Sequence, residues 1–140
     1  MNTDSESECY NEISLLICEF MGINIGVDMA QVTEICDIEV AEKRSRSVFY
    51  LHEKIVNIPD DIHYDTPRAL LVNHSGGKIG IIVDMPREIV SIPTTSVRPL
   101  PGLIELFKDL TPIWGVALRQ NSVVLLIDLL GLLDNENIIV

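Results

Sequence analysis

The chain has 140 residues, of which 47% are hydrophobic, 22% are charged and only 5% are aromatic. This composition excludes a disordered chain and indicates one globular unit with an aliphatic core, which favours β-sheet. The formal net charge of -11 argues against nucleic acid and against an anionic membrane surface as partners, because both would repel an acidic protein.

No targeting or membrane segment is evident from the sequence. Residues 1–11 are polar and acidic, unlike a signal peptide, and we interpret them as a disordered tail. The longest aliphatic run, residues 123–133, is too short to cross a bilayer and contains Asp128. Cys18 and Cys36 match no zinc or disulfide spacing and are interpreted as buried hydrophobes in a reducing compartment. We therefore expect a cytoplasmic protein without direct membrane insertion.

The first third of the chain predicts a hairpin followed by a helix. Residues 13–20 are apolar on both faces, and residues 23–27 alternate with a period of two after a glycine turn. Asp28 can cap a helix that ends near Cys36, because apolar residues then share one helical face. Residues 38–47 are charged and irregular and are predicted to form a loop, which carries the only basic cluster: Lys43, Arg44 and Arg46.

The middle of the chain predicts a β-meander. Residues 48–51 and 55–58 have strand composition and precede a loop at 59–67 that is bounded by prolines. Residues 69–72 and 79–83 flank a Gly-Gly turn, which is typical of a hairpin. Pro86 is expected to break the sheet before a third strand at 89–92, because proline cannot donate to a ladder.

The last third begins with a proline-rich connector at 93–102, with one short strand at 96–98. A helix is predicted at 103–110, strands at 113–118 and 123–127, and a short helix at 129–133 that begins at an Asp128 cap. The sequence thus predicts a mainly β protein with about nine short strands, a few short helices and no βαβ unit.

No convergent set of titratable groups indicates an enzyme, and we expect no catalytic residue, no cofactor and no metal. The Ser75–Lys78 stretch lacks the strand-to-helix context of a phosphate-binding loop. The richest metal-like group lies in one loop, so a metal-dependent enzyme remains a remote alternative. That loop holds Asp60, Asp61, His63 and Asp65.

The order of motifs resembles the CheW-like domain family, the coupling proteins of bacterial chemotaxis. The opening Phe20–Asp28 hairpin and the Val32-Thr33-Glu34-Ile35 run are similar to the start of that family. Gly80–Asp84 resembles its Gly-aliphatic-x-Val-Asp strand, and the connector at 97–101 resembles its Ile-x-Pro segment. Residues 115–117 and 125–133 resemble its last hairpin and terminal helix. The resemblance extends over residues 15–133.

The resemblance implies a fold and a function. The fold would be two small, intertwined five-stranded SH3-like β-barrels, so that residues 12–140 form a single CheW-like domain of two β-subdomains. The function would be a non-catalytic signalling scaffold. Its partners would be the regulatory domain of a CheA-type histidine kinase and the cytoplasmic tip of a chemoreceptor. The partner-binding residues implied are Val32, Ile35, Leu51, His52, Glu53, Gly80, Pro86 and Ile89.

The sequence departs from the family pattern at the Tyr50–Glu53 corner. His52 stands where the family has an arginine that contributes to partner binding, and Glu53 stands where it has a glycine. An imidazole does not reproduce the donor fork of an arginine. The alternative is therefore a divergent CheW-like interaction module in another signalling pathway.

Overall fold

The structure is a computed structural model that describes residues 11–55, 61–99 and 113–134. Strands dominate these residues, and the helices between them are short. In chain order the elements are β1 (Glu12–Phe20), β2 (Ile23–Asp28), η1 (Met29–Gln31), β3 (Glu34–Cys36), α2 (Ile38–Arg44), β4 (Ser47–Tyr50), η2 (Leu51–Lys54), β5 (Pro67–His74), β6 (Gly77–Pro93), η3 (Thr94–Ser96), β7 (Val97–Arg98), β8 (Ile113–Arg119), β9 (Ser122–Ile127) and α4 (Leu129–Asp134).

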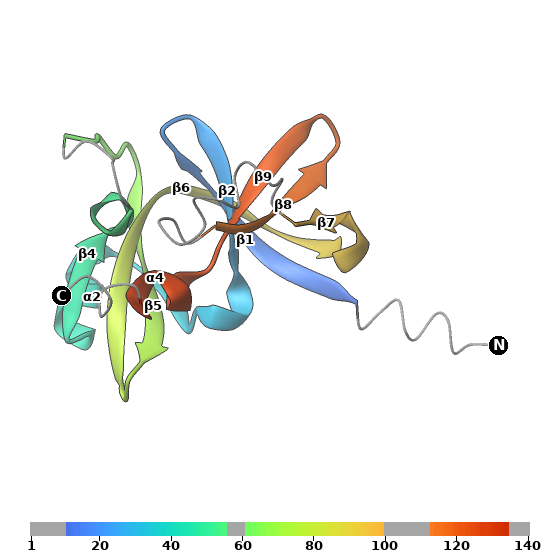
Figure 1. The fold of residues 1–140 in the computed structure, drawn as a ribbon. Coiled ribbons are helices and arrows are strands. Elements are labelled where there is room, and N and C mark those ends of the chain that lie inside the picture. The colour runs from blue at the N-terminus through green and yellow to red at the C-terminus, as the bar shows by residue number, and fades with distance from the viewer. Residues whose placement is uncertain (1–10, 56–60, 100–112, 135–140) are drawn as a thin grey trace.

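The nine strands form one sheet with the order β3-β5-β6-β1-β2-β9-β8-β7, and β4 pairs with β6 in parallel. Neighbours in this path are antiparallel, apart from the parallel pair of β2 and β9. The mainly β fold with few short helices is confirmed, although the pairings of the described strands follow an open path and do not close into barrels. Figure 1 shows two lobes, with α2, β4 and β5 on one side and β7, β8 and β9 on the other.

The long strand β6 connects the two lobes. Its first half pairs with β5 and β4, and its second half pairs with β1. The break predicted at Pro86 was therefore wrong, because β6 continues to Pro93. Opposite β1, the register shifts between Glu88 and Asp84, and Met85 takes a positive φ of 48°. Pro86 lies in this irregular stretch, so its missing N–H costs no regular ladder bond.

The aliphatic core extends to both faces of the sheet, as the two-sided pattern of residues 13–20 predicts. Leu16 and Cys18 of β1 belong to the largest core cluster, which also includes Leu70 of β5 and Leu129 of α4. Leu15 belongs to a second cluster beneath β8 and β9. A third, smaller cluster lies beneath α2. The chain thus buries β1 between two cores, one on each side.

The helix predicted to end near Cys36 was wrong. Only η1, a single 3-10 turn, follows Asp28, whose carboxylate accepts a hydrogen bond from the Ala30 N–H at 2.9 Å. The chain then extends into β3 because β5 offers an open edge, and Thr33 donates to the Leu71 carbonyl from its backbone N–H and from its hydroxyl. The β-branched residues Thr33 and Ile35 suit that extended conformation.

The loop predicted at residues 38–47 was also wrong, because most of it forms α2. Ala41 of this helix is buried, and Ile38 packs against the small cluster beneath it. Glu39 lies in the first turn, while Lys43 and Arg44 lie in the last, which is the favourable direction relative to the helix dipole. The charges that suggested a loop therefore occupy the solvent face and the two ends of a short amphipathic helix.

The N-terminus of α4 is tied to η1 across the sequence. The Gln31 side-chain amide donates to Asp128 Oδ1 at 2.8 Å, and the Leu129 N–H donates to Gln31 Oε1 at 2.9 Å. The cap predicted for the Asp128 side chain is thus supplied by Gln31, which binds the first free N–H of the helix. This pair of bonds fixes α4 against the end of β2.

Several predicted elements fall outside the described residues. These are the acidic tail, except for its last residue, the strand at 55–58, except for Ile55, and the helix at 103–110. The short strand predicted at 96–98 corresponds to β7, and the strands at 113–118 and 123–127 correspond to β8 and β9.

Cys18 is fully buried, and burial raises the pKa of its thiol from 9.0 to about 12, with Arg87 opposing and Asp84 adding to the shift. Because the thiolate is the reactive form, we expect a disulfide reagent at about pH 8 to modify Cys18 of the folded protein at least about a thousandfold more slowly than in urea. A Cys9→Ser, Cys36→Ala variant isolates this thiol, and the rate of thionitrobenzoate release measures it. Equal rates in the folded and unfolded protein would contradict the burial of β1.

Candidate partner-binding site

The corner after β4 places three of the predicted site residues together in η2. Leu51 is only 1% exposed and packs into the main core, whereas His52 is 9% exposed and is the buried polar residue of the described chain. Glu53 is exposed, and its Oε1 accepts a hydrogen bond from the Tyr50 N–H at 2.7 Å. Glu53 therefore closes the turn in place of a glycine, because its carboxylate binds a backbone donor that the short helix leaves free.

A tyrosine twelve residues further on completes this corner. Tyr64 Oη lies 3.2 Å from the His52 backbone N and 2.9 Å from His52 Nδ1. Since the backbone N–H donates to the hydroxyl oxygen, the phenolic proton is available to Nδ1, which then accepts. One hydroxyl group thus contacts both the backbone and the ring of His52. Burial raises the pKa of Tyr64 to about 12, with a smaller opposing contribution from the His52 hydrogen bond.

The three rings of the corner form one cluster. The Tyr50 and Tyr64 rings meet edge to face, with centroids 5.0 Å apart and planes at 71°, and the His52 ring lies 5.9 Å from Tyr50 and 5.5 Å from Tyr64. The cluster lines a pocket of about 430 Å³, together with residues from the following loop. The described residues that line it are Tyr50, His52, Glu53, Ile62, His63, Tyr64 and Pro67.

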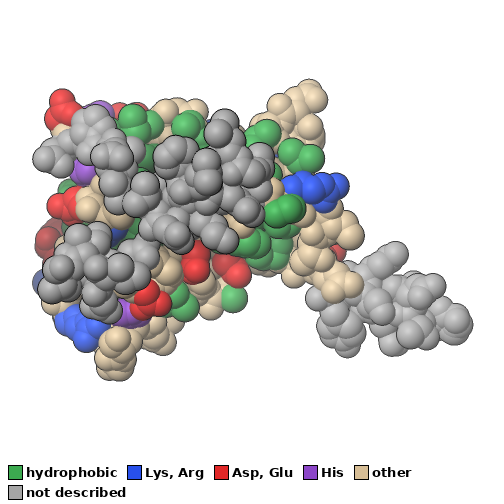
Figure 2. All heavy atoms as spheres, in the orientation of Figure 1, with side chains coloured by type: hydrophobic (Ala, Val, Ile, Leu, Met, Phe, Trp, Pro, Cys, Tyr) green, Lys and Arg blue, Asp and Glu red, His purple; other side chains and the backbone are tan. Residues whose placement is uncertain are grey.

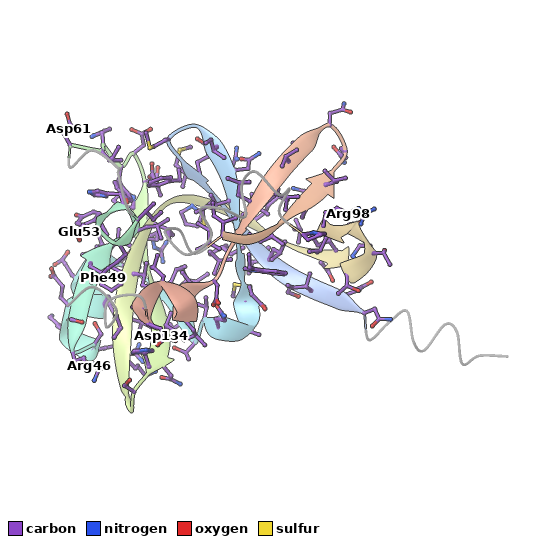
Figure 3. The ribbon with its side chains drawn as sticks, viewed as in Figure 1. Arg46, Phe49, Glu53, Asp61, Arg98 and Asp134 are labelled. Carbon is purple, nitrogen blue, oxygen red and sulfur yellow. The ribbon has the colours of Figure 1, made fainter. Side chains whose placement is uncertain are left out.

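The corner is accessible from outside the molecule. Tyr50 is 37% exposed, and Glu53 points away from the body of its lobe (Figure 3). In the space-filling view, acidic and histidine side chains gather at the edge of the molecule that holds this corner (Figure 2). An aromatic pocket with a single carboxylate at its rim is suited to contact with a partner, because few polar groups in it fix orientation while the rings supply area.

The other predicted site residues lie elsewhere. Val32 and Ile35 are half-buried and pack against the main core on the segment from η1 to β3. Pro86 is half-buried and Ile89 is 56% exposed, both on the second half of β6. The site residues therefore divide between the corner, the η1–β3 segment and the outer part of β6.

Gly80 is buried beneath α2, so a partner would meet the helix before it met this glycine. A Cβ at this position would lie 3.1 Å from Val48 Cγ2 and 3.4 Å from Ala41 Cβ. The absence of a side chain thus lets α2 and β4 approach β6 closely.

Sequence reasoning placed His52 and Glu53 in the site but missed Tyr50 and Tyr64 as members of its pocket. The signal for Tyr64 is weak: it is a lone aromatic residue in a charged loop bounded by prolines. Only the folded chain shows that its hydroxyl binds both the backbone and the ring of His52.

The loop that carries the remote metal hypothesis holds one close pair. His63 Nε2 lies 3.1 Å from Asp65 Oδ1, and both side chains are largely exposed, at 85% and 66%. Within the described ranges no three His, Cys, Asp or Glu side chains come close enough to hold a metal ion, and Asp60 lies outside those ranges. The described part of this loop therefore offers one exposed His–Asp contact and no convergent ligand set.

A comparison with family models matches the CheW-like domain over residues 47–137, which include the corner, the whole of β6 and the last hairpin. The chain belongs to the CheW-like domain family. The CheW-like resemblance drawn from the motifs is thereby confirmed. The matched residues begin at β4, so the family assignment covers the lobe-connecting strand and the pocket together.

A solved structure supports the same fold. The scaffolding protein TtCheW from Thermoanaerobacter tengcongensis is similar to this chain with a TM-score of 0.62 and 19% sequence identity, over 86% of each chain. No curated protein matches the sequence. None of the helices in the described residues is long and apolar enough to cross a membrane.

Proposed function

We propose that this CheW-like protein is a non-catalytic adaptor of chemotaxis-like signal transduction, which couples a chemoreceptor to a CheA-type histidine kinase. The observation that carries the proposal is the CheW-like domain match, because it covers the β5–β6 hairpin with the connecting strand β6 and the last hairpin, β8–β9. The similar solved structure is itself described as a scaffolding protein. In this proposal residues 12–140 act as one cytoplasmic domain of two β-subdomains, and residues 1–11 form a tail.

The exposed apolar residues of the sheet support contact as the mode of action. Ile89 on the outer half of β6 is 56% exposed, although its register partner Leu16 on β1 is only 3% exposed. The core thus ends along this strand, and an aliphatic side chain is left on the surface. Such a residue is suited to an interface, whose buried centre is depleted in charge. Partner binding is assigned to this strand, to the corner and to the η1–β3 segment.

Titration of the protein with the isolated regulatory domain of the cognate CheA-type kinase tests the proposal. We expect saturable binding in isothermal calorimetry, and we expect Ile89→Glu to weaken it at least tenfold, because a buried carboxylate without a partner costs more than about 1.4 kcal/mol. Val40→Glu on α2, which replaces a residue 37% exposed, is the matched control and should bind like the unaltered protein. Absence of saturable binding would reject kinase coupling.

The corner supports the second candidate, a divergent module that serves another pathway. Here His52 is buried and bonded to Tyr64, so the position no longer presents a surface cation. Under the second candidate His52→Arg leaves kinase binding unchanged. A gain of kinase affinity in that variant would instead favour the first candidate, because the arginine would then restore a missing contact.

A further inference from the structure

We propose that the pocket lined by Tyr50, His52, Glu53 and Tyr64 binds an arginine side chain of a partner protein. This inference deepens the proposed adaptor function and rests on it, because the arginine belongs to a docked protein.

The tyrosine rings of the pocket offer a surface on which a guanidinium group can stack. The face of an aromatic ring carries negative charge density, and a guanidinium group can stack on it while its N–H donors remain available. Tyr50 is exposed at the surface, and its edge-to-face contact with Tyr64, with planes at 71°, holds the two rings in one arrangement. The pocket therefore presents π surface that is already ordered before a ligand arrives.

The Glu53 carboxylate offers an acceptor for the guanidinium N–H groups. Glu53 Oε1 is fixed by the Tyr50 N–H, which orients the whole group. Among the described residues no partner is found for its second oxygen, which leaves an acceptor at the rim of the pocket. A planar guanidinium that stacks on a ring and donates to a carboxylate is satisfied by this combination, whereas the compact ammonium group of lysine cannot do both in one plane.

The charges around the pocket favour a cationic ligand. None of the described residues that line the pocket is a lysine or an arginine, and the His52 ring is bonded to the Tyr64 hydroxyl. Lys54, the nearest cation in the sequence, lies over the Phe49 ring, 4.7 Å from its centroid. Asp61 and Asp65 are exposed on the loop that borders the pocket, and Figure 3 shows Asp61 on the same side of the molecule as Glu53. The corner is therefore acidic and attracts a cation.

The test is a two-dimensional NMR titration of the full-length protein with N-acetyl-arginine methylamide as the probe. We expect weak, saturable shifts centred on the signals of Tyr50, His52, Glu53 and Tyr64. The uncharged citrulline derivative, which keeps the shape of the probe, should leave those signals in place. Glu53→Gln keeps the oxygen that caps Tyr50 and should weaken binding of the arginine probe about fivefold.

Glu42→Gln is the matched control, because it removes an exposed carboxylate on α2 and should leave binding of the arginine probe unchanged. Equal shifts with the citrulline probe would overturn the proposal, and so would arginine-induced shifts spread over the whole acidic surface or an unchanged affinity in Glu53→Gln. The titration contains no kinase or receptor. A failure of kinase coupling and a failure of this pocket are therefore separate results.

Discussion

Replacing Gly26 with valine is expected to lower the free energy of unfolding by about 1–3 kcal/mol, because the added side chain overpacks a filled core. Gly26 lies where β2 contacts both β1 and β9, opposite Ile17 and Leu126. A Cβ there would lie 3.0 Å from Val124 Cγ1, 3.2 Å from Leu126 Cδ2 and 3.4 Å from Leu15 Cδ1. All three neighbours belong to the second core cluster, so none can move without disturbing the others.

Urea unfolding followed by circular dichroism measures this loss. Gly77→Val is the control, because a Cβ at Gly77 meets only the flexible side chain of Arg46, at 3.3 Å, and the effect should stay within about 0.5 kcal/mol.

A double-mutant cycle tests the cause of the loss. Val124→Ala removes the closest atom, so Gly26→Ala should cost less in the Val124→Ala background than in the unaltered protein. Additive effects of the two substitutions would show that the clash is relieved elsewhere, and the close contact of β2 with the second cluster would not be what limits position 26.

The packing around Gly26 illustrates which parts of the fold the sequence could predict and which it could not. The hairpins follow from local chemistry: Met21 and Gly22 at one turn, and Ser75 and Gly76 at another, all take positive φ, as tight two-residue turns require. The sequence around Gly26 identifies it only as a small residue in a strand of alternating polarity. Its tight packing depends on Val124 and Leu126, about a hundred residues away, which no local pattern reveals.

The two wrong helix assignments have the same physical origin. Residues 29–36 have a helical apolar face, yet β5 offers an unpaired edge, and the backbone donors from Thr33 onward bind it instead. The tertiary hydrogen bonds override a weak local preference. Conversely, α2 forms from a charged stretch because Ala41 and Ile38 have an apolar surface on which to pack. In both segments the neighbouring part of the sheet determines the secondary structure, and the local sequence does not.

The candidate site shows a similar division. His52 and Glu53 stood out because they depart from a family pattern, but the pattern does not say what a histidine does there. The partner is Tyr64, and the loop between them carries no sequence signal that would pair the two residues. Gly80, in contrast, belongs to the segment that best matches the family pattern, yet its role is to allow close packing beneath α2. Motif strength therefore indicates fold more reliably than contact surface in this chain.

Replacing Tyr64 with phenylalanine is expected to destabilise the protein by about 1–3 kcal/mol at neutral pH, because the backbone N–H and Nδ1 of His52, which is buried, both lose their partner. The ring remains, so the edge-to-face contact with Tyr50 is retained and the loss is that of the hydroxyl alone. Tyr50→Phe is the matched control: Tyr50 is 37% exposed, so water can replace its hydroxyl, and stability should change by less than about 0.5 kcal/mol.

The stability difference between the unaltered protein and Tyr64→Phe should depend on pH, and the sign of that dependence follows from the pKa of Tyr64. Burial raises that pKa from 10.0 to about 12, so the folded state keeps the phenolic proton where the unfolded chain releases it. The stability that Tyr64 contributes is complete below about pH 10 and is lost as the pH rises toward 12. Urea unfolding of both proteins between about pH 9 and 11 should therefore show the advantage of the unaltered protein over Tyr64→Phe becoming smaller. A constant difference would mean that the hydroxyl is solvated, and the His52–Tyr64 hydrogen bond that orders the arginine pocket would then lose its support as well.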